Sequence, residues 1–282
     1  YVHDLFDTEG LEFIEKYKDT AFFLYMAYNV PHANNEAGYM FQDGMEVPDY
    51  GSYTEMDWPD PEKGFAAMIE NLDRSVGLIH AKLEELNLAE NTLVIFVSDN
   101  GPHEEGNHSA EFFDSNGILR GTKRDLYEGG IRTPFIARWP GTIAAGSTSG
   151  HVSAFWDMLP TFCEIAGVNI PAESDGISFL PTFKGQPDEQ DKHPFLYFEF
   201  YEQGGKQSIL LDQWKGVKLE VRSGNPKPTE LYNLAEDPSE SVNLADSYPE
   251  IVATMDSLMA LSHSPLEGIS LFNEEREADM AF

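Results

Sequence analysis

Cysteine is nearly absent from this sequence, which has one, Cys163, among 282 residues. A single cysteine excludes an internal disulfide and any cysteine-based zinc cluster. Basic residues are scarce as well: 18 lysines and arginines stand against 49 aspartates and glutamates, a formal net charge of −31. Because that charge repels a phosphate backbone, we expect no nucleic-acid partner. No apolar run approaches the roughly 18 residues that cross a bilayer, so we expect no membrane span.

The composition is that of a globular protein, with 41% hydrophobic and 24% charged residues. Short apolar runs bounded by turn residues predict strands at residues 21–28, 94–97 and 134–139. Between the first two runs, apolar positions from Phe65 to Leu86 recur with the one-sided spacing of an amphipathic helix. This order predicts a βαβ unit with a parallel sheet.

The pattern changes near residue 190, after a linker-like stretch. Short apolar runs separated by turns predict a small antiparallel sheet from strands at residues 195–200, 207–211, 214–221 and 230–234. Helices are predicted at residues 157–166 and from Pro249 onward. We therefore predict two domains, an α/β domain over residues 1–190 and a small α+β subdomain over residues 191–282.

Polar residues follow directly after the predicted strand at 94–97. Asp99 and Asn100 lie at its carboxyl end, the edge at which ligands bind in open α/β sheets. Carboxylate and amide oxygens are the ligands that calcium and magnesium prefer. The alternative is an Asp-Asn-Gly turn that is stabilised by its own side-chain hydrogen bonds.

Lys123 lies in a glycine-flanked basic segment, residues 119–132, of an otherwise acidic chain. An ammonium group there suits the oxygens of sulfate or phosphate. The alternative is a solvated loop in which the cations pair with Asp125 and Glu128.

Three histidines are further candidates. His32 follows the predicted strand at 21–28, so we expect it at the same sheet edge, although a lone histidine is often structural. His103 and His108 are spaced too loosely for a zinc motif and are candidate substrate contacts.

Five motifs in this order resemble one family. They lie at residues 22–32, 65–73, 98–103, 120–132 and 230–240. Together they resemble the type I, formylglycine-dependent sulfatases over about residues 20–262. The resemblance implies an alkaline-phosphatase-like α/β fold, with a mixed or parallel sheet flanked by helices and a smaller C-terminal antiparallel sheet plus helix.

The resemblance also implies a role for each candidate. Asp99 and Asn100 would bind calcium, with magnesium as the alternative. Lys123 would neutralise charge on the sulfate ester, and His32 would protonate the departing alkoxide. Substrate contacts are expected at His103, His108 and Arg120. The implied reaction is hydrolysis of a sulfate ester on a carbohydrate or aryl group, in the periplasm or outside the cell.

One element of the family pattern is missing. The formylglycine nucleophile arises from a Cys/Ser-x-Pro-x-Arg motif, and Cys163 is followed by Glu164-Ile165-Ala166. We therefore expect a segment outside this chain to supply the nucleophile and the remaining calcium ligands, and the chain alone to be inactive, with apolar sheet surface left uncovered. A phosphoester hydrolase of the same superfamily and a non-catalytic paralogue that binds sulfated glycans are the alternatives. The sequence indicates neither the sugar nor the oligomeric state.

Overall fold

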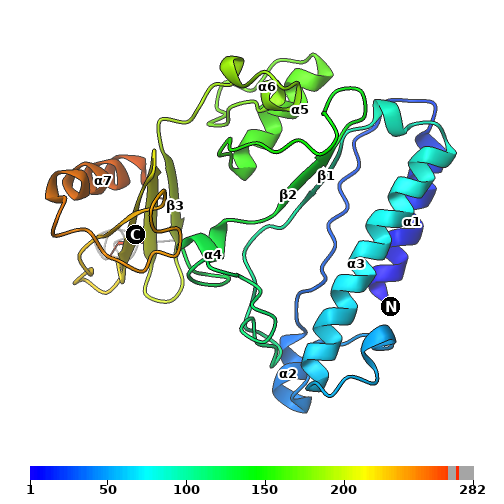
Figure 1. Ribbon diagram of the computed structural model, residues 1–282, viewed down its shortest axis with the longest axis horizontal. Coiled ribbons are helices and arrows are strands. Elements are labelled where there is room, and N and C mark those ends of the chain that lie inside the picture. Colours follow the sequence, from blue (N-terminus) through cyan, green and yellow to red (C-terminus); the bar gives the residue numbers. More distant parts are fainter. Residues whose placement is uncertain (266–270, 273–282) are drawn as a thin grey trace, which may run out of the picture. The chain divides into compact units, whose positions relative to one another are not determined.

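A computed structural model describes residues 1–265 and 271–272. Contacts divide the chain into two compact units, whose elements are labelled in Figure 1. Unit 1 contains residues 1–97, 102–115 and 134–145, and unit 2 contains residues 98–101, 116–133 and the chain from 146 onward. None of the helices in the described part is both long and apolar enough to cross a membrane. The predicted domain boundary near residue 190 stays a prediction.

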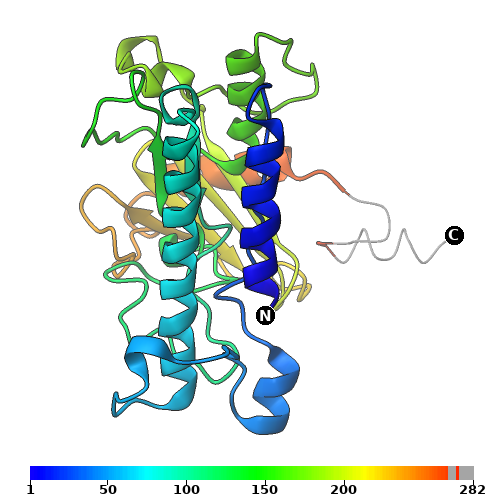
Figure 2. The same cartoon turned by 90° about the vertical axis from the view of Figure 1, so that its right-hand side faces the viewer.

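Unit 1 is built on two long helices, α1 (Val2–Tyr17) and α3 (Asp60–Glu85), which pack side by side (Figures 1 and 2). The prediction of an amphipathic helix is confirmed by α3. Pro61 and acidic residues lie in its first turn, where a proline fits and negative charge favours the helix dipole. Ile14 and Leu83, each 1% exposed, join the two helices in one apolar cluster.

The strands β1 (Val94–Val97) and β2 (Phe135–Arg138) confirm two predicted strands. They pair antiparallel, with Val94 opposite Arg138 and Val97 opposite Phe135. The parallel pairing predicted between residues 21–28 and 94–97 is not formed among the described residues. A parallel neighbour would need a crossover connection, usually a long helix, and the connection between β1 and β2 contains only a four-residue helix. The second strand therefore runs beside β1 in the opposite direction.

Residues 21–28 form no strand, which corrects the third strand prediction. Their side chains alternate between half-buried and exposed positions, and Phe23 and Tyr25 are 68% and 76% exposed. This alternation is typical of an extended chain, but a strand also needs a hydrogen-bonded neighbour, and none of the described segments supplies one. The sequence therefore predicts the local conformation without its partner.

The segment after residue 32 contains a short helix, α2 (Asn35–Phe41). The Asn34 side chain caps it by accepting a hydrogen bond from the Ala37 amide at 3.2 Å. Two glycines, Gly44 and Gly106, join this segment to the stretch after residue 101, with Gly44 N donating to Gly106 O at 2.9 Å. The segment after residue 32 and the stretch after residue 101 are thus packed together.

Unit 2 contains an antiparallel sheet in the order β3-β4-β5-β6, which confirms the predicted C-terminal sheet. Its strands are β3 (Leu196–Phe200), β4 (Lys206–Leu211), β5 (Trp214–Leu219) and β6 (Glu230–Asn233). The helices of this unit are α4 (Glu128–Ile131), α5 (Met158–Ala166), α6 (Leu180–Phe183) and α7 (Pro249–Ser262). The helices predicted at 157–166 and from Pro249 are confirmed by α5 and α7.

The two faces of this sheet bury different partners because successive side chains of a strand point to opposite sides. One face packs against α7 in a cluster of Ile209, Leu231, Met255 and Met259, each no more than 1% exposed. We call it the apolar face. Gly216 of β5 allows this approach, since a β carbon there would lie 2.7 Å from the Met255 sulfur.

The opposite face, which we call the polar face, packs against residues 120–132. Val217 and Tyr232 of the sheet form an apolar cluster there with Tyr127. The same face carries Lys215, which is 0% exposed. The sheet therefore has hydrocarbon on one side and charged groups beside its apolar residues on the other.

Candidate active site

The turn that follows β1 carries the two predicted metal ligands. Ser98 Oγ donates to the carbonyl oxygen of Asn100 at 2.9 Å, and Asn100 Nδ2 donates to the carbonyl oxygen of Gly101 at 2.9 Å. Asp99 is exposed and Asn100 is half-buried. The Asn100 amide oxygen therefore points away from Gly101, and the Asp99 carboxylate is accessible to solvent.

Glycines fix this turn against residues 120–132, which we call the lysine loop. Gly101 N donates to Gly130 O at 2.9 Å, and Gly129 N donates to Arg120 O at 2.7 Å. A β carbon on Gly101 would lie 1.8 Å from Gly129 O, so only glycine fits at this position. The structure thus packs the turn with Asp99 and Asn100 directly onto the loop that carries Lys123.

Lys123 is half-buried in this loop. The next residue, Arg124, has a backbone φ of +78°, in the left-handed region that non-glycine residues adopt at a cost in energy. Gly121, two residues before Lys123, has a φ of +85°. The backbone on either side of Lys123 therefore has a specific, constrained path.

The donors at the turn match calcium chemistry in type but not in number. Calcium takes about six to eight oxygen ligands, of which one aspartate and one asparagine supply about three at most. Across residues 1–265 and 271–272, no group of three or more His, Cys, Asp or Glu side chains could hold a metal ion. Asp99 and Asn100 can therefore form part of a calcium or magnesium site, and other ligands must complete it.

His32 belongs to unit 1, and its side chain is 52% exposed. Its Nδ1 lies 2.8 Å from the carbonyl oxygen of Ala33, which can only accept, so Nδ1 carries the proton. Its Nε2 lies 3.7 Å from Oε2 of Glu105, whose side chain is 12% exposed. This imidazole is oriented by a backbone carbonyl on one side and a carboxylate on the other, as a proton-transfer group requires.

A pocket of about 570 Å³ opens beside His32. Its polar lining comes from the segment after residue 28. Asn29, Asn34 and Glu46 contribute side chains, and Asn34 Nδ2 donates to Glu46 Oε2 at 2.6 Å. Within unit 1, this pocket is the concave surface next to a candidate catalytic group.

His103 and His108 are buried, at 6% and 3% exposure, which argues against their predicted role as substrate contacts. His103 Nδ1 accepts the Glu105 amide at 3.1 Å, and its Nε2 lies 2.8 Å from Pro31 O. The chain around residue 105 is thereby tied to the chain beside His32. Both ring nitrogens of His103 are bonded to backbone groups, which favours a structural role.

His108 lies deeper in the same unit. Its Nδ1 bonds the Glu62 carboxylate of α3, and its ring stacks on Phe65 with centroids 3.8 Å apart. The second Glu62 oxygen accepts the Ser109 amide at 3.0 Å. These contacts fix the segment after residue 102 on the first turn of α3. We therefore leave His108 out of the candidate site.

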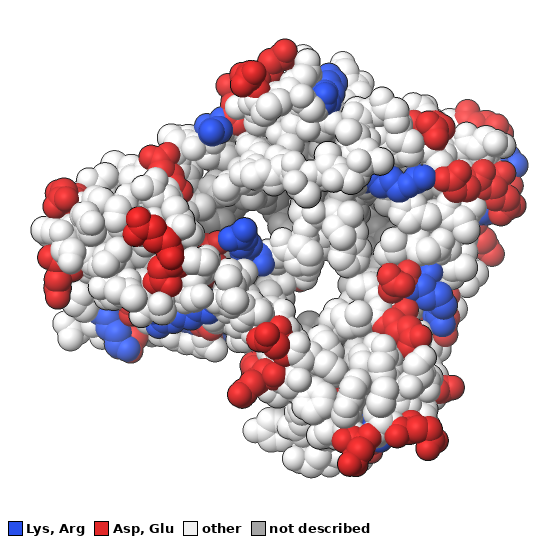
Figure 3. All heavy atoms as spheres, viewed as in Figure 1, with Lys and Arg blue, Asp and Glu red and all other residues white. Residues whose placement is uncertain are grey.

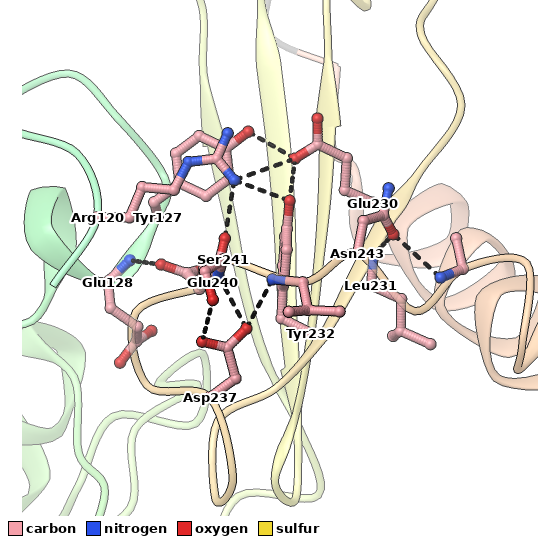
Figure 4. Close-up of polar contacts among 12 residues, drawn as sticks. Arg120, Tyr127, Glu128, Glu230, Leu231, Tyr232, Asp237, Glu240, Ser241 and Asn243 are labelled. Atoms are coloured by element: carbon pink, nitrogen blue, oxygen red, sulfur yellow. Dashed lines mark hydrogen bonds and ion pairs between the residues drawn. The ribbon is translucent and has the colours of Figure 1, made fainter.

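Arg120 was predicted to contact substrate, but its guanidinium has protein partners (Figure 4). Its Nη1 donates to Tyr232 Oη at 2.8 Å and to Glu240 O at 3.0 Å. Its terminal carbon lies 3.8 Å above the centre of the Tyr127 ring. Arg120 attaches the lysine loop to the C-terminal sheet, and we leave it out of the substrate-binding set.

A second constellation resembles a nucleophile triad without its chemistry. His3 Nε2 lies 2.8 Å from Ser75 Oγ, which is 2.9 Å from Asp7 Oδ2. The carboxylate bonds the serine instead of the histidine, and His3 and Ser75 are 0% exposed. In a working triad the carboxylate orients the histidine, so this network is a buried link between α1 and α3.

Two family models match overlapping parts of the chain. A model of the sulfatase family matches residues 3–168, and a model described as the C-terminal part of N-sulphoglucosamine sulphohydrolase matches residues 120–263. The chain belongs to the sulfatase family. This sulfatase chain has the alkaline-phosphatase-like α/β fold with a small C-terminal antiparallel sheet.

Two relatives show how far the likeness extends. The steryl-sulfatase of Homo sapiens is 34% identical over 193 residues, covering 67% of this chain and 30% of that protein. An N-acetylgalactosamine-6-O-sulfatase of Bacteroides thetaiotaomicron is 26% identical over 276 residues, covering 92% of this chain and 50% of that protein. The chain thus spans half or less of the length of these sulfatases.

Among solved structures, the crystal structure of Ps i-CgsB matches with a TM-score of 0.78 and 27% identity, covering 99% of this chain and 58% of that chain. Its complex with k-i-k-neocarrahexaose matches with a TM-score of 0.75 and 28% identity, covering 99% and 58% of the two chains. Both units of this chain therefore have counterparts in a single solved protein.

Several residues with functional surroundings escaped sequence reasoning. Glu105 and the buried residues Lys206, Lys215 and Glu240 were not predicted. The sequence did contain one signal, since Lys215 and Lys218 interrupt an otherwise apolar strand. Because they are three positions apart, their side chains point to opposite faces of the sheet, and each face is packed against another part of the chain.

Proposed function

We propose that this chain forms part of a sulfatase that hydrolyses a sulfate ester on a carbohydrate. Membership of the sulfatase family supports the reaction class. Two similar proteins support the substrate class, since one is named an N-acetylgalactosamine-6-O-sulfatase and the other, Ps i-CgsB, was crystallised in complex with k-i-k-neocarrahexaose. The observation that carries the proposal is the packing of the Asp99–Asn100 turn onto the lysine loop through Gly101 and Gly129.

Within this proposal, Asp99 and Asn100 supply two of the ligands of a calcium or magnesium ion. Such an ion, when bound, would hold sulfate oxygens and withdraw their charge. Lys123 binds the sulfate ester from the adjacent loop. Its ammonium stabilises negative charge that shifts towards the bridging oxygen as the sulfur–oxygen bond breaks.

His32 is assigned the proton transfer to the leaving group. An alkoxide is a poor leaving group, so a proton delivered to the bridging oxygen lowers the barrier. Nδ1 is bonded to the Ala33 carbonyl, so the transfer is assigned to Nε2, which lies 3.7 Å from Glu105 Oε2. The pocket beside His32, with Asn29, Asn34 and Glu46, is assigned to the sugar that departs.

Cys163 is not the nucleophile in this proposal. It lies within α5 and is half-buried, in a helix that ends at Gly167. The formylglycine expected from the family resemblance, and an exported location, stay predictions.

The proposal is tested with the protein encoded by the complete reading frame. We expect hydrolysis of 4-nitrophenyl sulfate and of a sulfated oligosaccharide, and loss of about 100-fold or more in kcat on Lys123→Ala or His32→Ala. Faster turnover of 4-nitrophenyl phosphate would instead support a phosphoester hydrolase. Tight binding of sulfated oligosaccharide without turnover would support the non-catalytic alternative.

A further inference from the structure

The lysine loop is held on the polar face of the C-terminal sheet by buried charged groups. Lys215 of β5 is 0% exposed, and its Nζ donates to Glu128 Oε1 at 2.8 Å. Glu240 is also 0% exposed, and its Oε2 accepts the Glu128 amide at 2.8 Å (Figure 4). The first residue of α4 is thus bound through both its side chain and its backbone.

A third buried charge acts next to Lys123 itself. Lys206 of β4, 6% exposed, donates from Nζ to Arg124 O and to Asp125 Oδ1, each at 2.8 Å. Arg124 is the residue with a left-handed backbone, so this bond stabilises the least favourable conformation in the loop. Lys206 therefore fixes the direction of the chain immediately after Lys123.

The loop is attached before Lys123 as well. Arg120 bonds Tyr232 and the Glu240 backbone, and Tyr127 Oη donates to Glu230 Oε2 at 2.6 Å (Figure 4). Attachments at residues 120, 124 and 128 leave Lys123 between fixed points. A loop held in this way loses little conformational entropy when its ammonium binds an anion.

Buried ions are a costly way to obtain stability alone. Removing two charges from water costs several kcal/mol per ion, and well-packed apolar residues often stabilise as well or better. The apolar face of the same sheet shows that this unit can use methionine and leucine to pack against a helix. The charges on the polar face therefore have a geometric role.

We propose that Lys206, Lys215 and Glu240 are positioning residues that fix the lysine loop and hold Lys123 at the anion site. This inference rests on the proposed function for the role of Lys123. It gives the C-terminal sheet a part in the chemistry through the position of Lys123.

The test compares two lysines of one strand in the protein encoded by the complete reading frame. Lys215→Met removes the bond to Glu128, whereas the matched control Lys218→Met removes an ion pair with Asp256 of α7, 3.0 Å long, on the other face. Hydrogen–deuterium exchange is measured for peptides covering the lysine loop, and inorganic sulfate is titrated into each protein.

We expect Lys215→Met to speed exchange in the lysine loop by about tenfold or more and to weaken sulfate binding by a similar factor. Lys218→Met should leave both within about twofold. Equal effects of the two variants, or unchanged exchange in Lys215→Met, would overturn the inference.

A third variant separates this inference from the proposed function. Lys123→Met should abolish sulfate binding and speed exchange in the loop by less than Lys215→Met does. If the unmodified chain binds sulfate no better than Lys123→Met, the proposed role of Lys123 fails, and the exchange data still decide whether the loop is held.

Glu240 provides a second route if Lys215→Met does not fold. In Glu240→Gln a carbonyl oxygen can still accept the Glu128 amide, whereas Glu240→Ala removes the acceptor. We expect the glutamine variant to keep slow exchange in the lysine loop and full sulfate affinity. The alanine variant should exchange about tenfold faster in the loop and bind sulfate about tenfold more weakly. Equal behaviour of the two variants would contradict a positioning role for Glu240.

Discussion

The two faces of the C-terminal sheet solve the same packing problem in different ways. On the apolar face, Ile209 and Leu231 meet the methionines of α7 without a buried charge in the cluster. On the polar face, Lys215 and Glu240 are equally buried but are bonded to the lysine loop. Burial of the same extent thus supports stability on one face and a fixed backbone path on the other.

The largest expected effect is on the polar face. Lys215→Met removes the buried cation of Glu128 and leaves only the exposed Arg132, 3.8 Å from its carboxylate, so we expect the free energy of unfolding to fall by about 3 kcal/mol. Urea denaturation at pH 7 measures this loss. The double variant Lys215→Met/Glu128→Gln should recover part of this loss. A loss below about 1 kcal/mol in the single variant would contradict the view that the polar face depends on its buried charges.

The second-largest effect is expected from a cavity created on the apolar face. Ile209 is 0% exposed and lies opposite Gly216 in the sheet, where no side chain can fill the space that it would leave. Ile209→Ala should lower the free energy of unfolding by about 2–4 kcal/mol. Exchange in the lysine loop should remain as slow as in the unmodified chain. Faster exchange there would show that the two faces are coupled.

A smaller effect depends on pH. Burial raises the pKa of the Glu240 carboxyl from 4.5 to about 7, despite the Glu128 amide and Lys215, which act in the opposite direction. Since the folded state holds this proton where the unfolded state has released it, the contribution to stability is present below pH 4.5 and is lost as pH rises towards about 7.

Glu240→Gln removes that titration. We expect the variant to gain about 2 kcal/mol relative to the unmodified chain between pH 4.5 and pH 8. Urea denaturation midpoints of both proteins at pH 4.5 and pH 8 measure the gain. Repulsion among the other carboxylates affects both proteins equally and therefore cancels in the difference between them. A constant difference across this range would show that Glu240 ionises normally in the folded protein.

The smallest effect belongs to Lys218. Its side chain is 27% exposed, and its ion pair with Asp256 lies near solvent. Lys218→Met should change the free energy of unfolding by about 1 kcal/mol or less. A loss as large as that of Lys215→Met would remove the distinction between the two lysines.

Periodicity predicted most elements of this fold because it reports which side of a helix or strand is buried. The helix α3 and the four C-terminal strands followed from spacing alone. Residues 21–28 did not form a strand, because a strand depends on a neighbour that spacing within one segment cannot indicate. The antiparallel return of β2 was missed for the same reason.

The candidate site was predictable in part. Asp99, Asn100 and Lys123 followed from a strand end and a glycine-flanked loop, and the packing of Gly101 on Gly129 now gives these two segments a common position. The burial of His103 and His108 could not be predicted, because polarity in a loop does not reveal burial. Their bonds to Pro31 and Glu62 come from residues more than 40 positions away.

Carboxylates far outnumber lysines and arginines on the face drawn in Figure 3, in keeping with the formal charge of −31. Any polyanion that approaches this chain meets a field of its own sign. That field extends about 30 Å at 0.01 M salt and about 8 Å at 0.15 M. Added salt should therefore quicken such an encounter, whereas it slows the approach of polyanions to basic proteins.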